Sequence, residues 1–562
     1  MHNEYNTHEV FNQYTEISDY NLFTTDQVLQ DYFIKHHLHE MAEDLKIFGE
    51  QIGSEESYHD GSLANAYTPI LHSFDNRGNR TDFVEFHPAW HRFMAYCKTT
   101  GLIGRGFASN EPFRWSYVAA NFMMQTQVEA GALCPATMTL ACIPLIQKEP
   151  KLWEELKDKL VSSEYDERDI PIAQKKSIWI GMGVTEKQGG SDVRTNTTYA
   201  TPMGESGRGH AYKITGHKWF FSAPMCDAHL VVAKTTDTDE ICTFFVPRWK
   251  SDGTKNPLQI QRLKEKLGNK SNSSCEIEFR NAYGILIGEE GRGIPTIMEM
   301  ANTTRFCCVL GSAGIARQAT VQAIAYAQRR EAFGKTLYNQ PLMRNVLVDM
   351  ALETEAAQVL ALRLAEAFEK GDSDSTALAW KRFMTPASKF WVCKRAEAIT
   401  AEAMEVFGGN GYIEDGNAIM ARLYKESPVN SIWEGSGNVM CLDVLRVVNK
   451  HPQMVESILD ELKRMSEGDE RILKELATLL HLFRSNQTSL ESKGRILTEK
   501  LMLITQACLL KKESPKFISE AFIELRLVQG ITGNFGAFDG EQIDYEQILK
   551  RAFPLIGIKN EG

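Results

Sequence analysis

The sequence predicts a mainly helical α+β protein with a compact β domain between helical parts. Before residue 180 and after residue 293, apolar residues recur at spacings of three and four, as amphipathic helices require. Between these parts, glycine, serine, threonine and asparagine become more frequent, and short runs alternate in polarity as strands do. The chain has 562 residues, too many for one ordinary core, so we expect several packed domains.

Four domains are expected along the chain. They are an N-terminal helical domain with an N-terminal extension (residues 1–180), a β domain (181–290), a four-helix bundle (291–450) and a C-terminal helical module (451–562). The boundaries follow the change of composition after residue 180, the return of helical periodicity, and a His-Pro pair near residue 451.

The same patterns predict particular elements. Loops are expected near residues 75–80 and 149–150. The strands expected in the β domain span residues 211–215, 230–234, 241–246 and 275–279. The bundle helices are expected at residues 294–330, 341–369, 376–407 and 438–448, with breaks at 371–374 and 408–411.

Composition and charge argue against several classes of protein. The formal net charge is -11, so the surface as a whole repels nucleic acid and acidic membranes. Eleven cysteines are scattered without a CxxC pair or zinc-ligand spacing, which indicates reduced, mostly buried thiols and no metal site. The N-terminus has no basic segment followed by an apolar run, and the apolar stretch at 501–510 is too short to cross a bilayer. We therefore expect a cytoplasmic protein.

Two segments of the β domain have the residue types that a flavin site needs. Residues 181–198 read GMGVTEKQGGSDVRTNTT, where small residues let backbone N–H groups approach a planar or phosphate-bearing ligand. Residues 216–222 read GHKWFFS, which places aromatic rings and a hydroxyl on a predicted strand. Taken alone, the first segment is more often a turn and the second an ordinary strand core. The first is neither a Rossmann fingerprint nor a P-loop.

Two further segments flank the predicted bundle helices. Residues 329–334 (RREAFG), followed by Gln340, offer guanidinium donors to a pyrophosphate and a ring to an adenine. Residues 407–412 (FGGNGY) stop a helix and leave backbone free for close contact. In isolation, the simpler interpretations are a basic helix end and a glycine cap.

The fifth segment, residues 428–438, reads PVNSIWEGSGN and contains a candidate base. Glu434 stands beside an aromatic residue, just before a helix that Ser436 can cap. Burial beside a cofactor would raise the proton affinity of Glu434 and suit it to act as a base. In isolation, a Glu-Gly pair in a loop is usually exposed and without such a role.

Together, the five segments resemble the acyl-CoA dehydrogenase superfamily. The similarity is strongest to its AidB-like branch, an isovaleryl-CoA dehydrogenase-like group, and it extends to about residue 450. In the N-terminal third it rests on residues 10–13 (VFNQ), 86–91 (FHPAWH) and 127–131 (QVEAG). The resemblance implies the acyl-CoA dehydrogenase fold, with a barrel-like β domain and FAD as the cofactor.

The resemblance also implies roles for individual residues. The flavin and phosphate contacts would be Val184, Thr185, Gly190, Ser191, Phe220, Ser222, Ile432, Ser436 and Asn438, with the Ser222 hydroxyl near flavin N5. Residues that a neighbouring subunit contributes to the adenosine half would be Arg330, Phe333 and Gln340, and the backbone at Gly408 and Gly409 would approach the pyrophosphate. Glu434 would be the catalytic base, with Arg305 as a second catalytic residue.

Three positions depart from the family pattern. Trp219 stands one position before Phe220, which aligns with the aromatic that stacks near the flavin. Glu405 stands where glutamine is frequent near the pyrophosphate, and Asn302 replaces an acidic residue.

The implied activity is FAD-dependent α,β-dehydrogenation of an acyl-CoA thioester in fatty acid metabolism, with flavin N5 as the hydride acceptor. The implied partners are the acyl-CoA substrate, an electron-transfer flavoprotein or similar acceptor, and further copies of the chain in a homotetramer or dimer. Two alternatives stay open: an acyl-CoA oxidase, or an AidB-like protein that binds acyl-CoA or DNA in the alkylation response with little dehydrogenase activity. Residues 451–562 hold 15 Lys and Arg against 17 Asp and Glu, which disfavours DNA contact there.

Overall fold

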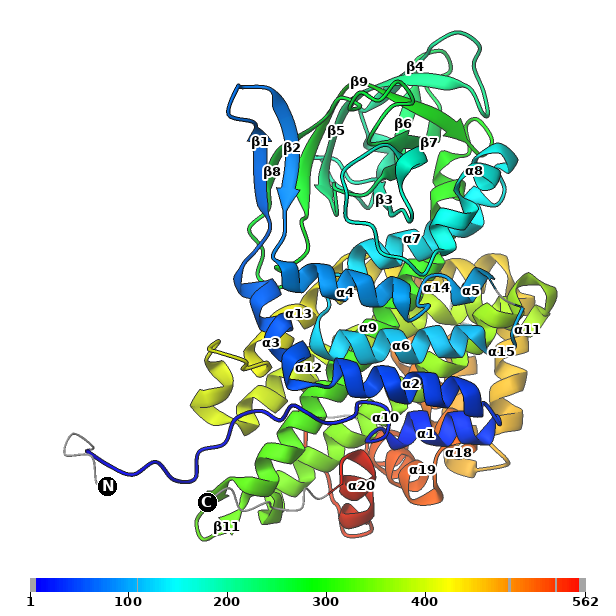
Figure 1. The fold of residues 1–562 in the computed structure, drawn as a ribbon. Helices are drawn as coiled ribbons and strands as arrows, with labels where there is room; N and C mark the ends of the chain where they lie inside the picture. Colours follow the sequence, from blue (N-terminus) through cyan, green and yellow to red (C-terminus); the bar gives the residue numbers. More distant parts are fainter. Residues whose placement is uncertain (1–6, 109, 484–486, 531–532, 555–562) are drawn as a thin grey trace.

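A β domain lies at one end of a larger helical body (Figure 1). The computed structural model describes residues 7–554, apart from residues 109, 484–486 and 531–532. Within this described part, no helix is both long and apolar enough to cross a membrane. The architecture confirms the predicted α+β class, with helical parts on both sides of the sheet in the sequence.

The N-terminal part is helical but also contains a β-hairpin. Its helices are α1 (Gln27–Lys35), α2 (His39–Ile52), α3 (Glu55–Ala66), α4 (Pro88–Thr99), α5 (Arg105–Ala108), α6 (Arg114–Val128), α7 (Leu133–Ile146) and α8 (Pro150–Val161). The hairpin pairs β1 (Ile70–Phe74) with β2 (Arg80–Glu85), and its turn is the loop predicted near residues 75–80. Of the loop predicted at 149–150, Glu149 lies outside the helix, at the N-cap position of α8, whereas Pro150 is the first residue of that helix.

The β domain closes on itself. It contains β3 (Ile180–Gly183), β4 (Tyr199–Pro202), β5 (Ala211–Phe221), β6 (Ala228–Thr235), β7 (Ile241–Pro247), β8 (Leu258–Leu263) and β9 (Cys275–Ile287). β6 pairs with β4 and β7, β7 with β9, β9 with β5, and β5 with β4, so these five strands form a closed ring. β3 extends the ring along β6, and β8 extends it along β9. This pairing confirms the barrel-like domain.

One long helix organises the helical body. α9 (Gly293–Arg329) has 37 residues and is buried over most of its length. It contacts α6, α7, α10 (Pro341–Lys370), α12 (Thr385–Val406) and α13 (Met420–Ile432). Because neighbours surround it, apolar and small residues occur on all of its sides rather than on one face.

The predicted bundle helices are confirmed with one omission. The helix expected at 376–407 consists of α11 (Ser375–Ala379), a π-helical turn (Trp380–Met384) and α12 in succession. α14 (Gly437–Lys450) is the helix predicted near residue 438. The sequence analysis missed α13, which contains Pro428 in its interior and therefore lacked a clear helical signal.

Helices also follow the bundle. They are α15 (Pro452–Met465), α16 (Glu470–Phe483), α17 (Gln487–Ser492), α18 (Gly494–Glu513), α19 (Lys516–Ile523), a π-helical turn (Glu524–Val528) and α20 (Tyr545–Ala552). α18 packs against α10, α12 and α14, and the buried Arg526 pairs with Asp349 and Glu353 of α10. These contacts attach the C-terminal helices to the bundle.

Candidate active site

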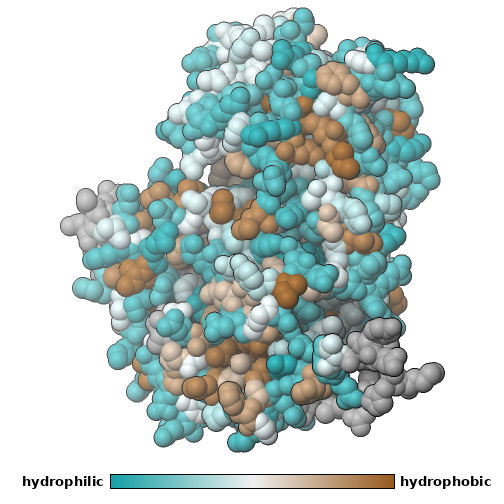
Figure 2. Space-filling view, turned by 90° about the vertical axis from the view of Figure 1, so that its left-hand side faces the viewer, coloured by the Kyte–Doolittle hydropathy of each residue, from teal (hydrophilic) through white to brown (hydrophobic). Residues whose placement is uncertain are grey.

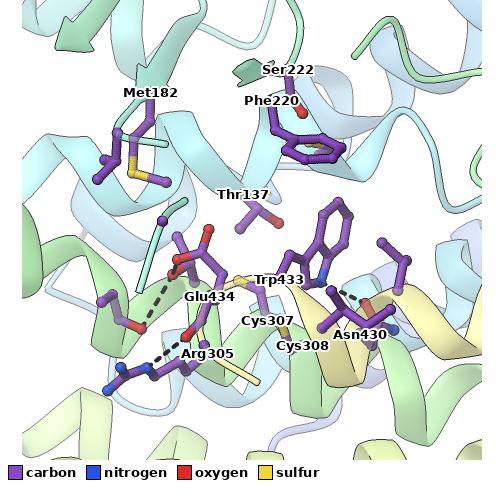
Figure 3. A pocket seen from close by; sticks show the side chains of 18 of the residues that line it. Thr137, Met182, Phe220, Ser222, Arg305, Cys307, Cys308, Asn430, Trp433 and Glu434 are labelled. Carbon is purple, nitrogen blue, oxygen red and sulfur yellow. Dashed lines mark hydrogen bonds between the residues drawn. The ribbon is translucent and has the colours of Figure 1, made fainter. Parts of the chain in front are cut away.

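A cavity of about 1060 Å³ lies where the β domain meets the helical body. Figure 3 shows Met182, Phe220 and Ser222 of the β domain on one side, facing Glu434, Cys307 and Cys308 on the other. Figure 2 shows apolar side chains gathered at the junction of the two parts on one face of the molecule. Segments that are far apart in the sequence therefore form the two walls of one cavity.

Glu434 lines this cavity in an unusual backbone conformation. It lies between α13 and α14, with φ of 58°, in the left-handed region that residues other than glycine rarely adopt. The Thr304 hydroxyl, on α9, donates to Glu434 Oε2 at 2.6 Å. The carboxylate is therefore directed toward α9 and into the cavity (Figure 3).

Two cations hold the backbone around Glu434. Arg305 Nε donates to the Glu434 carbonyl oxygen at 3.0 Å, and Lys389 Nζ donates to the Gly435 carbonyl oxygen at 2.8 Å. The same Arg305 guanidinium binds Asp443 of α14 at 2.6 Å. Although burial alone would raise the pKa of Asp443, Arg305 and its neighbour Arg382 lower it. These contacts favour a positioning role for Arg305.

The opposite wall is formed by the loop after β3 and by β5. Lys218 Nζ lies 2.8 Å from Glu186 Oε1, and both side chains are fully buried beneath the loop. Burial alone would raise the pKa of Glu186, but Lys218 and hydrogen bonds from Thr197 and Thr198 lower it to about 2. The loop also requires a glycine, because a Cβ at Gly190 would lie 2.4 Å from the Thr185 hydroxyl oxygen.

The aromatic wall of the cavity comes from one of the two adjacent rings on β5. Phe220 lines the cavity and is 56% exposed, whereas Trp219 is not among the lining residues. Lys264 lies over both rings, 3.7 Å from the Trp219 centroid and 4.6 Å from that of Phe220. Ser222, two residues later, lines the cavity beside Ser274. Phe220 is thus the ring available to a planar ligand.

Comparison with known proteins agrees with this geometry. Residues 12–167 match the model of the adaptive response protein AidB N-terminal domain, residues 181–282 the acyl-CoA dehydrogenase middle domain, and residues 291–449 the acyl-CoA dehydrogenase C-terminal domain. The chain is 43% identical over 526 residues to AidB of Escherichia coli strain K12, covering 93% of this chain and 94% of that protein. The chain belongs to the acyl-CoA dehydrogenase family, in its AidB branch.

Two further comparisons extend this assignment. Acyl-CoA dehydrogenase family member 11 of Caenorhabditis elegans is 32% identical over 491 residues, covering 81% of this chain and 76% of that protein. A crystal structure of Caenorhabditis elegans ACDH-11 in complex with C11-CoA superimposes with a TM-score of 0.83 at 26% identity, covering 92% of this chain and 93% of that one. The acyl-CoA dehydrogenase fold therefore extends over most of this AidB-type chain.

Ten of the predicted site residues of this AidB-type protein line the cavity. They are Val184, Thr185, Gly190, Ser191, Phe220, Ser222, Arg305, Ile432, Glu434 and Ser436. Ser436 occupies the N-cap position of α14, as expected, but the predicted capping bond is wrong, because its side chain accepts no hydrogen bond from the helix. Asn438 lies outside the lining, where its Oδ1 accepts from Arg495 Nε at 2.9 Å.

The other five predicted residues lie toward the far end of α9. Arg330 donates to the Asn12 carbonyl oxygen, and Gln340 Nε2 donates to the Ala332 carbonyl oxygen at 2.9 Å. Phe333 is fully exposed in the turn between β10 (Glu331–Ala332) and β11 (Lys335–Thr336). No atom outside the local backbone lies within 4 Å of a Cβ built at Gly408 or Gly409.

These five residues belong to one surface, which we call the α9-end surface and define by Arg330, Phe333, Gln340, Gly408 and Gly409. Tyr326 stacks on Phe407 with a centroid distance of 4.2 Å, and Asn410 Nδ2 donates to Gln13 Oε1. Asn12 exchanges two hydrogen bonds with the backbone of Glu331. The N-terminal segment thus links the hairpin to the glycine-rich turn.

The sequence analysis missed several residues of the site. Thr304 and Lys389 orient the Glu434 loop, and Lys266, Asn269 and Glu426 line the cavity. Thr304 directly precedes Arg305 on the same predicted helix, and this position is the only feature of the sequence that could have identified Thr304 as a site residue. The other four come from segments whose proximity to Glu434 depends on tertiary packing.

Proposed function

We propose that this protein catalyses FAD-dependent α,β-dehydrogenation of an acyl-CoA thioester, with Glu434 as the base. The observation that carries the proposal is the position of the Glu434 carboxylate. It lies in a cavity between the helical body and a wall that suits a flavin, and Thr304 fixes its direction. A base must lie within reach of the proton that it removes, and the position of this carboxylate in the cavity supports that role for a thioester bound there.

The residues of the β-domain wall fit FAD. Phe220 offers an apolar ring surface, and Ser191, Ser222 and the backbone of the glycine-containing loop offer polar groups beside it. Such a combination suits a flat, partly polar ring that carries phosphates. When bound, FAD supplies the hydride acceptor for the reaction.

Glu434 removes the proton from the α-carbon while the β-hydrogen departs as a hydride, leaving a double bond between the two carbons. Negative charge develops on the thioester oxygen as the proton leaves, so a donor near that oxygen accelerates the reaction. The backbone N–H of Glu434 is the donor that we assign to this role. Arg305 and Lys389 fix the two carbonyl groups that follow this N–H in the chain.

Sharing of FAD between two copies of the chain would explain why five of the predicted FAD-binding residues lie on the α9-end surface and not in the cavity. Thr304 and Arg330 are separated by 26 residues of sequence, nearly all within α9, which amounts to roughly 39 Å at ~1.5 Å per residue. A flavin bound beside Glu434 would therefore lie far from the α9-end surface of the same chain, and its adenosine half would have to span most of this distance to reach that surface. We therefore infer a homodimer or homotetramer in which the α9-end surface of one copy completes the FAD site of another.

The complex of ACDH-11 with C11-CoA supports an acyl-CoA as the substrate class. The physiological oxidant would be an electron-transfer flavoprotein or a similar acceptor. The test is an anaerobic titration of the purified yellow protein with acyl-CoA thioesters of several chain lengths. We expect loss of flavin absorbance with at least one thioester, and retention of the oxidised spectrum with all of them would refute the proposal.

A further inference from the structure

The cavity continues past Glu434 along one face of α9. This face begins at Thr304, whose hydroxyl bonds to Glu434, and the residues that follow it in the lining at helical spacing are Cys307, Cys308, Gly311 and Ile315. Figure 3 shows Cys307 and Cys308 among them. From Thr304, α9 rises by roughly 10 Å to Gly311 and roughly 16 Å to Ile315, at ~1.5 Å per residue. The cavity therefore extends well beyond the Glu434 carboxylate.

The two ends of the cavity differ in exposure and polarity. At the far end of this face, Phe122 and Thr126 of α6 line the cavity with Ile315, and each of these three residues is at most 3% exposed. The Thr126 hydroxyl already donates to the Phe122 carbonyl oxygen at 2.8 Å. Elsewhere the lining includes Asp192 and Arg194, which are exposed. An acyl chain therefore suits the closed, apolar end, and the phosphates of CoA suit an open, polar one.

Gly311 lies where α6, α9 and α13 meet at this far end. A Cβ built at Gly311 would lie 3.4 Å from Asn430 Nδ2, 3.6 Å from Phe122 Cε1 and 3.8 Å from Thr126 Cγ2. These are ordinary van der Waals separations. The surrounding helices therefore leave room for a side-chain carbon at this position.

Gly314, three residues later on α9, differs from Gly311 in this respect. A Cβ at Gly314 would lie 2.5 Å from the Met123 carbonyl oxygen, so the packing of α9 against α6 requires a glycine there. No such contact requires one at Gly311. Glycine within a helix is less stable than alanine, so Gly311 weakens α9 without a packing reason. The space that its missing side chain leaves adds to the cavity.

We propose that Gly311 sets the depth of the acyl pocket, the part of the cavity between Thr304 and Ile315, and that its missing side chain admits straight acyl chains longer than about ten carbons. This inference rests on the proposed acyl-CoA substrate. An extended chain advances by ~1.2 Å per bond, because three bonds of an extended backbone span ~3.6 Å. A chain whose α-carbon lies at Glu434 therefore reaches Gly311 after about eight or nine bonds, and longer chains continue toward Ile315.

The proposal predicts how affinity depends on chain length. Each methylene group that leaves water strengthens binding by up to about fourfold. In the wild type, affinity should therefore keep rising as the chain passes Gly311. In Gly311→Val, the added methyl groups occupy the space beside Phe122 and Thr126, so carbons beyond this point cannot be buried.

The test measures binding of S-alkyl-CoA thioethers to the FAD-loaded protein by calorimetry. These compounds lack the thioester carbonyl, so their α-protons are not acidic and no turnover contributes heat. We expect a thioether of about 14 carbons to bind the wild type at least about tenfold more tightly than one of about eight. In Gly311→Val the longer compound should bind no more tightly than the shorter one. Ile315→Phe, one turn deeper, should weaken the longer compound more than the shorter one.

Two further variants separate depth from folding. Ser312→Ala changes the adjacent residue of α9, which does not line the cavity, and should retain the wild-type ratio of affinities. Gly311→Ala adds a carbon that the neighbours can accommodate, so it should melt at or above the wild-type temperature while reducing the ratio. It decides the question if Gly311→Val does not fold. A lower melting temperature for Gly311→Ala would overturn the inference, because the glycine would then be required by packing.

Equal affinities for the two thioethers in the wild type, or an unchanged ratio in the Gly311 variants, would also overturn the inference. Either result would leave the proposed function intact. The proposed dehydrogenation fails separately, if thioesters of every length leave the flavin of the wild type oxidised while the thioethers still bind with the expected dependence on length.

Discussion

At the residue scale, Glu434 combines a strained backbone with several fixed contacts. A left-handed conformation in a residue other than glycine costs roughly 1–3 kcal/mol and persists only when the surroundings impose it. Arg305 and Lys389 bind the two successive carbonyl oxygens, and Thr304 binds the carboxylate. These contacts hold Glu434 in the strained backbone conformation that directs its side chain into the cavity.

Substituting Arg305 tests this positioning role. In Arg305→Lys the positive charge near Asp443 remains. The planar guanidinium group, which also donates to the Glu434 carbonyl oxygen, is lost. We expect the rate of flavin reduction by acyl-CoA to fall by about 10²-fold, as for a misplacement of ~1 Å, with a much smaller change in thioester affinity. Rapid-mixing kinetics and calorimetry measure the two quantities. Equal losses of rate and affinity would argue against positioning.

Glu426 should give the protein a measurable pH dependence of stability. Burial, and secondarily the nearby Glu129, raise its pKa from 4.5 to about 7, although Asn269 and Arg422 act in the opposite direction. The folded state therefore binds more protons than the unfolded state between these values, so this residue lowers stability as pH rises from about 4.5 to about 7.

Glu426→Gln removes this titration. Relative to the wild type, the variant should gain up to about 3 kcal/mol in unfolding free energy between pH 5 and pH 8, since each pKa unit corresponds to ~1.4 kcal/mol. Urea unfolding at the two pH values measures this change. A difference between the proteins that does not vary with pH would contradict the assignment.

At the scale of elements, the buried pair of Lys218 and Glu186 connects β5 to the loop after β3. Lys218→Met would leave Glu186 buried without its cation, a change that typically costs about 3–5 kcal/mol. We expect a lower melting temperature and a lower ratio of flavin to protein absorbance. Lys187→Met, at an adjacent exposed position of the same loop, is the control and should change neither. Normal FAD content in a destabilised Lys218→Met protein would separate this pair from the flavin site.

The predictability of elements depended on the strength of local signals. α9 and α10 were predicted to within one residue because their long periodic patterns begin and end at clear breaks. The short strands β3, β4 and β8 and the half-exposed hairpin of β1 and β2 were missed, because their stability comes from pairing with distant segments.

The site residues were likewise predictable only where they lie within a local sequence motif. Glu434 and the Phe220 wall each lie within a short motif, so the sequence alone was enough to identify them as lining residues. Lys389 and Glu426 carry no local motif. Packing of α12 and α13 against α9 brings Lys389 to the Gly435 carbonyl oxygen and Glu426 to the cavity. Tertiary contacts between distant segments therefore account for what the sequence could not predict.

At the scale of the whole molecule, the α9-end surface leads to a prediction about assembly. Phe333 on this surface and Tyr412, three residues after Gly409, are largely exposed, which is unusual for aromatic side chains outside interfaces. Figure 2 shows apolar patches on the side of the molecule that carries β11 in Figure 1. A second copy of the chain would cover such side chains and contribute to the FAD site.

Arg330→Ala tests this shared site. Truncating one partner of a buried charge pair typically costs about 2–5 kcal/mol, so FAD occupancy should fall clearly in the variant. Lys335→Ala, an exposed position on the same hairpin, should retain both FAD and assembly. Flavin absorbance and light scattering measure the two properties. A stable monomeric Arg330→Ala protein with full FAD content would disprove the shared site.

The central claim is that Glu434 is the base, and flavin reduction by Glu434→Gln tests it most directly. Glutamine keeps the size and hydrogen bonding of the side chain but cannot accept the α-proton. Using a thioester that reduces the wild type, we expect the variant to retain FAD and to show a ligand-induced change in flavin absorbance. Its rate of reduction should fall by about 10²- to 10⁴-fold, the usual contribution of a general base. Reduction of Glu434→Gln at the wild-type rate would contradict the account.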